Sequence, residues 1–204
     1  MTDQSKPGDV ELVTGFTVAQ YRSALEDREK GRAVIADAIH RRFVERYLGP
    51  IADPPSEQRH GFTMMAVACL MIEALQSFRS GWPDTSKKGD GKHAFCSFFD
   101  EHPDFGSLHG HAGAFYKSVR CGILHQAETT DGWRIRRDQA ELLTSTPSGF
   151  IVDAKRFTDK LREALDRYRD ELKSAPWDDE LWKNLKHKMQ TVCANCESKA
   201  KHAS

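Results

Sequence analysis

The sequence lacks an excess of charge of either sign, because thirty lysines and arginines stand against thirty aspartates and glutamates in 204 residues. A histone-like basic binder and an acidic disordered tail both need a large net charge, so both classes are excluded. A long apolar run is also missing: the longest, Met64–Ile72, is far shorter than the roughly twenty residues that cross a bilayer. The chain starts without the basic and apolar segments of a secretory signal. We therefore expect a cytoplasmic protein that does not contact membranes.

The five cysteines are an odd number without the spacing of a disulfide framework, so we expect reduced thiols. Cys193 and Cys196 form one C-x2-C pair, and a zinc signature needs a second pair of ligands at suitable spacing. The chain also has no G-x-S-x-G elbow, no P-loop and no dinucleotide fingerprint that opens a helix. We expect neither a metal nor a cofactor.

What the sequence does have is helical spacing of its apolar residues over most of its length. Residues 1–16 show no such spacing and are expected to form a loose N-terminal tail, followed by a single helical domain over residues 17–204. The segments that predict helices are 18–47 as one broken helix or two, 61–80, 115–126, 157–172 and 181–192.

The predicted helix 61–80 is apolar nearly all the way round for three turns, which places it at the centre of a bundle. Turn-rich connections are expected at 51–60 and 81–92, and short segments between Trp133 and Val152 predict one or two small β-hairpins. The predicted fold class is an all-α bundle with a small β-hairpin insert.

The segment FYKSVRCGILHQAE places four residues between Arg120 and His125. On an ideal helix this separation turns about 140°, so geometry alone does not put both side chains on one face. The segment resembles the R-x4-H signature of HEPN domains, which are small helical bundles. GFTMMAVACLMIEALQSF is similar to the central HEPN helix, and the DGWRI that follows the motif is similar to the later part of the domain. The resemblance covers roughly residues 35–172.

The resemblance implies a HEPN-like bundle that works as a metal-independent endoribonuclease in bacterial toxin–antitoxin or antiviral defence systems. Such cleavage needs a base for the RNA 2′-hydroxyl and a fixed cation for the phosphorane-like transition state, and it leaves 2′,3′-cyclic phosphate ends. His125 has the right chemistry for the general base and Arg120 for the phosphate. The implied partners are RNA, an antitoxin or defence-system protein, and a second copy of the chain, since family members form homodimers.

Glu73 is an isolated carboxylate on the apolar central helix, and a buried charge requires a partner. We expect Glu73 to reach Arg120 or His125 and to complete the catalytic set, with Gln76 and Ser77 extending a polar stripe. A helix that simply emerges into solvent at Glu73 is the alternative. The candidate substrate-binding residues are Lys117, Gln126, His109 and His111.

Cys121 follows the arginine where active HEPN members usually carry a polar residue. This departure favours a second hypothesis, a catalytically silent HEPN domain that binds RNA, a nucleotide or a partner protein. A third hypothesis is a purely structural protein in which Arg120 and His125 belong to an intramolecular network.

Overall fold

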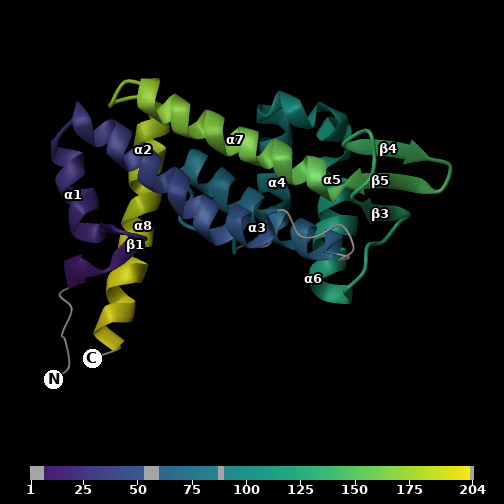
Figure 1. Ribbon diagram of the computed structural model, residues 1–204, viewed down its shortest axis with the longest axis horizontal. Helices are drawn as coiled ribbons and strands as arrows, with labels where there is room; N and C mark the ends of the chain where they lie inside the picture. Colours follow the sequence, from purple (N-terminus) through teal and green to yellow (C-terminus); the bar gives the residue numbers. More distant parts are fainter. Residues whose placement is uncertain (1–6, 53–59, 87–89, 203–204) are drawn as a thin grey trace. The chain divides into compact units, whose positions relative to one another are not determined.

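The computed structural model describes residues 7–52, 60–86 and 90–202 (Figure 1). Their contacts divide them into two compact units. The first consists of residues 7–46, 77–83 and 165–202, and the second of 47–52, 60–76, 84–86 and 90–164. Residues 1–6 of the predicted tail, and residues 53–59 and 87–89 of the two predicted turn-rich connections, lie outside the described residues.

The first unit begins with a small hairpin that the sequence did not predict. After a 3₁₀ turn, η1 (Pro7–Asp9), the strands β1 (Glu11–Val13) and β2 (Phe16–Thr17) pair antiparallel. Leu12, Val13 and Phe16 are buried. The expectation of a loose tail is therefore wrong for residues 11–16, because three apolar side chains anchor this segment.

Helices α1 (Val18–Glu26) and α2 (Lys30–Phe43) follow the hairpin, so residues 18–43 form two helices and not one broken helix. Thr17 and Gln20 form a capping box at the start of α1. The break lies at Asp27, whose carboxylate accepts hydrogen bonds from the Glu29 and Lys30 amides. A π-helical turn, η2 (Val44–Leu48), follows α2 and leads into the second unit at Tyr47. Residues 165–174 and the C-terminal helix α8 (Glu180–His202) complete the first unit.

The second unit is built on α3 (Gly61–Arg79), of which residues 61–76 belong to it. The other helical elements are η3 (Gly49–Ile51), α4 (Asp90–Glu101), η4 (Pro103–His111), α5 (Ala112–Phe115), η5 (Tyr116–Cys121), α6 (Gly122–Gln126) and the first half of α7 (Ala154–Ser174). Six fully buried phenylalanines form its aromatic core: Phe95, Phe98, Phe99, Phe105, Phe115 and Phe157. The Phe115 and Phe157 rings stack with centroids 5.4 Å apart, which fixes α5 against α7.

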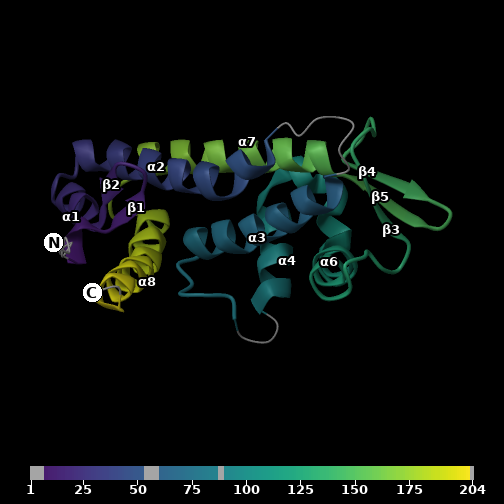
Figure 2. The same ribbon diagram turned by 60° about the horizontal axis from the view of Figure 1, so that its bottom comes forward.

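The sheet of this unit contains β3 (Trp133–Arg136), β4 (Leu143–Thr146) and β5 (Gly149–Asp153) in the order β3-β5-β4 (Figure 2). β4 and β5 form the predicted antiparallel hairpin. β3 instead pairs parallel with β5, with Trp133 opposite Phe150. The expectation of hairpins alone is thus corrected to a three-stranded mixed sheet, while the predominantly helical fold class is confirmed.

Within the described part of the chain, α3 is the one helix long and apolar enough to span a bilayer. However, 61% of its apolar window is buried inside the protein. This burial matches the core position that the sequence predicted for the helix.

Candidate functional site

The R-x4-H segment lies in a continuous helical stretch from α5 through η5 to α6. Arg120 belongs to the π-helical η5 and His125 to α6. A π-helical turn is rare and often occurs at functional sites. The sequence spacing predicted a helix here, and the structure adds the π-helical turn around Arg120.

The loop after α6 folds back on the helix and holds it in place. Ala127 adopts a left-handed conformation with a φ of 55°, which ends α6. The Thr130 amide then donates to the Ser118 carbonyl oxygen at 3.0 Å, and the Ser118 hydroxyl donates to Asp131 at 2.8 Å. The returning loop thereby bonds to the backbone and the buried side chain two residues before Arg120.

Glu73 and Arg120 form the central contact of the site. The Arg120 Nε donates to the Glu73 Oε1 at 2.7 Å, and the two side chains are only 18% and 11% exposed. The predicted partner of the isolated carboxylate is therefore confirmed as Arg120. The alternative of a helix emerging into solvent is wrong, because Leu75 and Gln76 beyond Glu73 are fully buried.

The surroundings of this pair hold the guanidinium in one orientation. The Thr85 hydroxyl donates to the second Glu73 oxygen at 3.3 Å, and the Arg120 guanidinium carbon lies 5.4 Å from the centre of the Tyr116 ring. Among the side-chain nitrogens of Arg120, Nε donates a hydrogen bond to Glu73, and the two terminal nitrogens make no hydrogen bond within the described residues. The planar fork of these two nitrogens is therefore available to a ligand.

The electrostatics keep this arginine charged. Burial acts to lower the pKa of Arg120, but the hydrogen bond and negative charge of Glu73 outweigh it and raise the pKa above its ordinary value. Burial raises the pKa of the neighbouring Tyr116 hydroxyl; Cys121 acts in the same direction, and Arg120 opposes both. The site thus presents a permanent cation beside a neutral phenol.

His125 is not joined to this pair. It is exposed near the C-terminal end of α6, as is the predicted substrate-binding residue Gln126. In the described part of the chain, His125 has no hydrogen bond or ion pair. The predicted pairing of Glu73 with at least one of the two motif residues therefore holds through Arg120 alone.

The other candidate substrate-binding residues occupy different settings. The Lys117 Nζ lies 3.0 Å from Asp131, with 74% of its side chain exposed. His109 is exposed in η4. His111 packs its ring against Phe150, with centroids 4.6 Å apart, and so contributes to the core side of the sheet.

Sequence reasoning missed two residues of the site. Tyr116 lies four residues before Arg120, so helical spacing alone would have placed the ring and the guanidinium together. Thr85 lies in the connection between α3 and α4, where no periodic signal indicates its contact with Glu73.

No protein-family model matches the chain, and no curated protein or solved structure matches it significantly. A function is therefore inferred from the chemistry of the Glu73–Arg120 pair and of the residues around it.

Proposed function

We propose that the second unit is a HEPN-type domain that cleaves RNA as a metal-independent endoribonuclease. The observation that carries the proposal is the geometry of Arg120. Glu73 occupies Nε at 2.7 Å, and the terminal nitrogens have no partner among the described residues. A guanidinium fixed in this manner offers two parallel donors to two phosphate oxygens.

In the proposed reaction His125 takes the proton of the 2′-hydroxyl, and the 2′-oxygen attacks the adjacent phosphorus. The bond between phosphorus and the 5′-oxygen breaks, the 5′-oxygen takes a proton from water and leaves as a 5′-hydroxyl end, and a 2′,3′-cyclic phosphate remains on the other fragment. Arg120 stabilises the charge that develops on the phosphorus oxygens, and Glu73 holds Arg120 in place. The setting that we propose is bacterial defence or a toxin–antitoxin system in the cytoplasm.

A homodimer is part of the proposal, because no contact joins His125 to Arg120 in the described residues of one chain. A two-fold axis places the same patch of two subunits opposite itself. Arg120 of one subunit and His125 of the other then complete a cleft between them.

A second candidate function is RNA, nucleotide or partner-protein binding without cleavage. It is favoured by the exposed position of His125, since a general base is usually oriented by a third group. Cys121 directly after Arg120 favours it as well.

The test is to incubate the purified full chain with labelled RNA in the presence of a chelator. We expect cleavage to cyclic-phosphate ends that is lost in Arg120→Ala and His125→Ala. The matched controls are Arg162→Ala and His187→Ala, which remove an exposed arginine and an exposed histidine elsewhere. RNA binding without cleavage would select the second candidate, and neither binding nor cleavage would leave a structural role for the pair.

A further inference from the structure

The two outer strands of the three-stranded sheet differ in how well their free edges are protected from pairing with another chain. β3 carries the exposed arginines Arg134 and Arg136. Arg134 reaches across the sheet to the Thr146 and Ser148 hydroxyls at 3.1 and 3.0 Å, whereas Arg136 pairs with Asp138 next to β3. The charges of Arg136 and Asp138 discourage pairing of β3 with another chain. β4 has the sequence LTST, without a charge or a proline. The β4 edge is therefore the one at which a further strand can be added.

The register of β4 shows which backbone groups face outward. The Asp153 amide donates to the Leu142 carbonyl oxygen at 3.0 Å, and Thr144 pairs with Ile151. In an antiparallel pair alternate residues bond to the neighbouring strand, so the N–H and C=O groups of Leu143 and Ser145 point away from β5. Within the described residues they have no partner.

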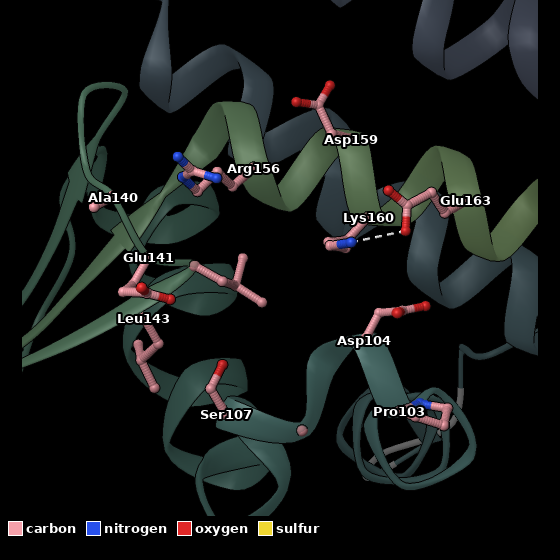
Figure 3. Close-up of a pocket in the computed structure, with 12 residues that line it drawn as sticks. Pro103, Asp104, Ser107, Ala140, Glu141, Leu143, Arg156, Asp159, Lys160 and Glu163 are labelled. Atoms are coloured by element: carbon pink, nitrogen blue, oxygen red, sulfur yellow. Dashed lines mark hydrogen bonds and ion pairs between the residues drawn. The ribbon is translucent and has the colours of Figure 1, made fainter.

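A hollow of about 450 Å³ adjoins the start of this edge (Figure 3). It lies between β4, η4 and the first turns of α7. In Figure 3 the Ser107 hydroxyl and the Glu141 carboxylate point toward its centre. Both side chains lack a hydrogen bond or ion pair in the part of the chain that the structure describes. Leu142 and Leu143 supply an apolar wall.

The charge of the hollow indicates what it accepts. Four carboxylates, Asp104, Glu141, Asp159 and Glu163, line it together with the two cations Arg156 and Lys160. The cations already have acceptors: Arg156 Nε donates to the Gln139 carbonyl oxygen at 2.8 Å, and Lys160 contacts Glu163 at 2.8 Å. Asp159 contacts Lys155 at 3.4 Å, so Glu141 is the carboxylate of the lining that has no hydrogen bond or ion pair within the described residues. No group of side chains suited to a metal ion occurs among the described residues. A lysine or arginine side chain, with an apolar stem and a cationic end, complements this lining.

We propose that the β4 edge and its hollow bind an extended segment of a partner protein. The segment adds a strand to β4 through the outward groups of Leu143 and Ser145, and one lysine or arginine of that segment enters the hollow. Main-chain hydrogen bonds provide affinity in this mode of recognition, and the side-chain pocket provides specificity. The surface is independent of the Glu73–Arg120 pair and of the proposed cleavage of RNA.

The probe is a displayed library of random heptapeptides, selected on the full chain. We expect the selected peptides to alternate β-branched residues around one lysine or arginine. Their synthetic versions should bind Glu141→Arg at least about tenfold more weakly, because the reversed charge opposes the peptide cation. Ser145→Pro should weaken binding to a similar extent, since proline removes an outward N–H that β4 does not use for β5. Ser145→Ala is the matched control and should bind like the unaltered chain.

Circular dichroism and urea unfolding test whether Ser145→Pro is folded. If this variant does not fold, Glu141→Arg and amide chemical shifts of Leu143 and Ser145 on peptide addition decide alone. The proposal would be overturned if the selection yielded peptides without a basic residue, or if the peptides bound Glu141→Arg as tightly as the unaltered chain. Shifts at Leu143 and Ser145 that follow protein concentration without peptide would also overturn it, since a second copy would then be the occupant.

Discussion

At the scale of single residues, the Glu73–Arg120 pair removes two charges from most of their water. Truncating one partner of such a pair leaves the other charge uncompensated, which destabilises by about 3 kcal/mol or more. We therefore expect Glu73→Ala to lower the free energy of unfolding by about 3 kcal/mol in urea titrations. Glu73→Gln should lower it less, because its amide oxygen can still accept from Nε.

The control for this prediction is the double variant Glu73→Met with Arg120→Leu, which removes both charges together. It should be more stable than Glu73→Ala, because no charge remains without its partner. Equal stabilities of the single and double variants would show that the pair contributes nothing through its charges.

Buried thiols and phenols make the stability of the folded protein decrease at alkaline pH. Burial raises the pKa of Cys193 from 9.0 to about 11, and burial also raises the pKa values of Tyr21 and Tyr168. The folded state favours the neutral thiol, so its contribution is complete below pH 9 and is lost as the pH rises toward 11. We expect the urea midpoint to fall between pH 8.5 and pH 10.5, less steeply in Cys193→Ala. Equal slopes in the two proteins would contradict the role of Cys193.

At the scale of elements, Gly122 is required where the loop after α6 returns to the helix. A Cβ at this position would lie 2.5 Å from the Glu128 carbonyl oxygen. We therefore expect Gly122→Ala to lower the free energy of unfolding by about 1–3 kcal/mol, because the backbone of the loop at Glu128 must move away from the new Cβ. RNA binding or cleavage should fall with it, since the loop also bonds to Ser118 beside the Arg120 turn.

Gly113 in α5 is the matched control for this change. A Cβ there would meet only the Cε and Nζ atoms of Lys92, which end a flexible side chain. Gly113→Ala should be neutral or stabilise by about 0.5–1 kcal/mol, as alanine replaces glycine within a helix. A similar loss in both variants, measured by urea unfolding, would contradict the importance of the close approach at Gly122.

Local patterns predicted the helices, and the polar exception within one of them predicted the ion pair. α3 was recognised from its continuous apolar character, and Glu73 stood out against it, so that a partner had to exist. The hairpin of β1 and β2 was missed because strands of three and two residues show no periodicity. The parallel pairing of β3 with β5 and the π-helical turn at Arg120 depend on contacts across the fold, which no local spacing encodes.

At the scale of the whole molecule, the proposed homodimer predicts complementation between inactive variants. If each cleft takes Arg120 from one subunit and His125 from the other, a mixed dimer of Arg120→Ala and His125→Ala has one complete site. With random exchange of subunits in a two-fold dimer, roughly a quarter of the unaltered activity should return. Cleavage assays on refolded mixtures, with mass determined by light scattering, test this. Full activity in a strictly monomeric fraction would contradict the shared site.

The π-helical turn η5 also has a genetic consequence for the assembled protein. Such a turn encloses one residue more than an α-helical turn, as if a single codon had been inserted between Tyr116 and Cys121. An extra residue that stayed α-helical would instead rotate every later residue by about 100° around the helix axis. The wider turn absorbs the extra residue locally, so that α5 before it and α6 after it remain one continuous helical stretch. The turn that contains Arg120, and not the R-x4-H spacing alone, therefore sets the direction in which the arginine points.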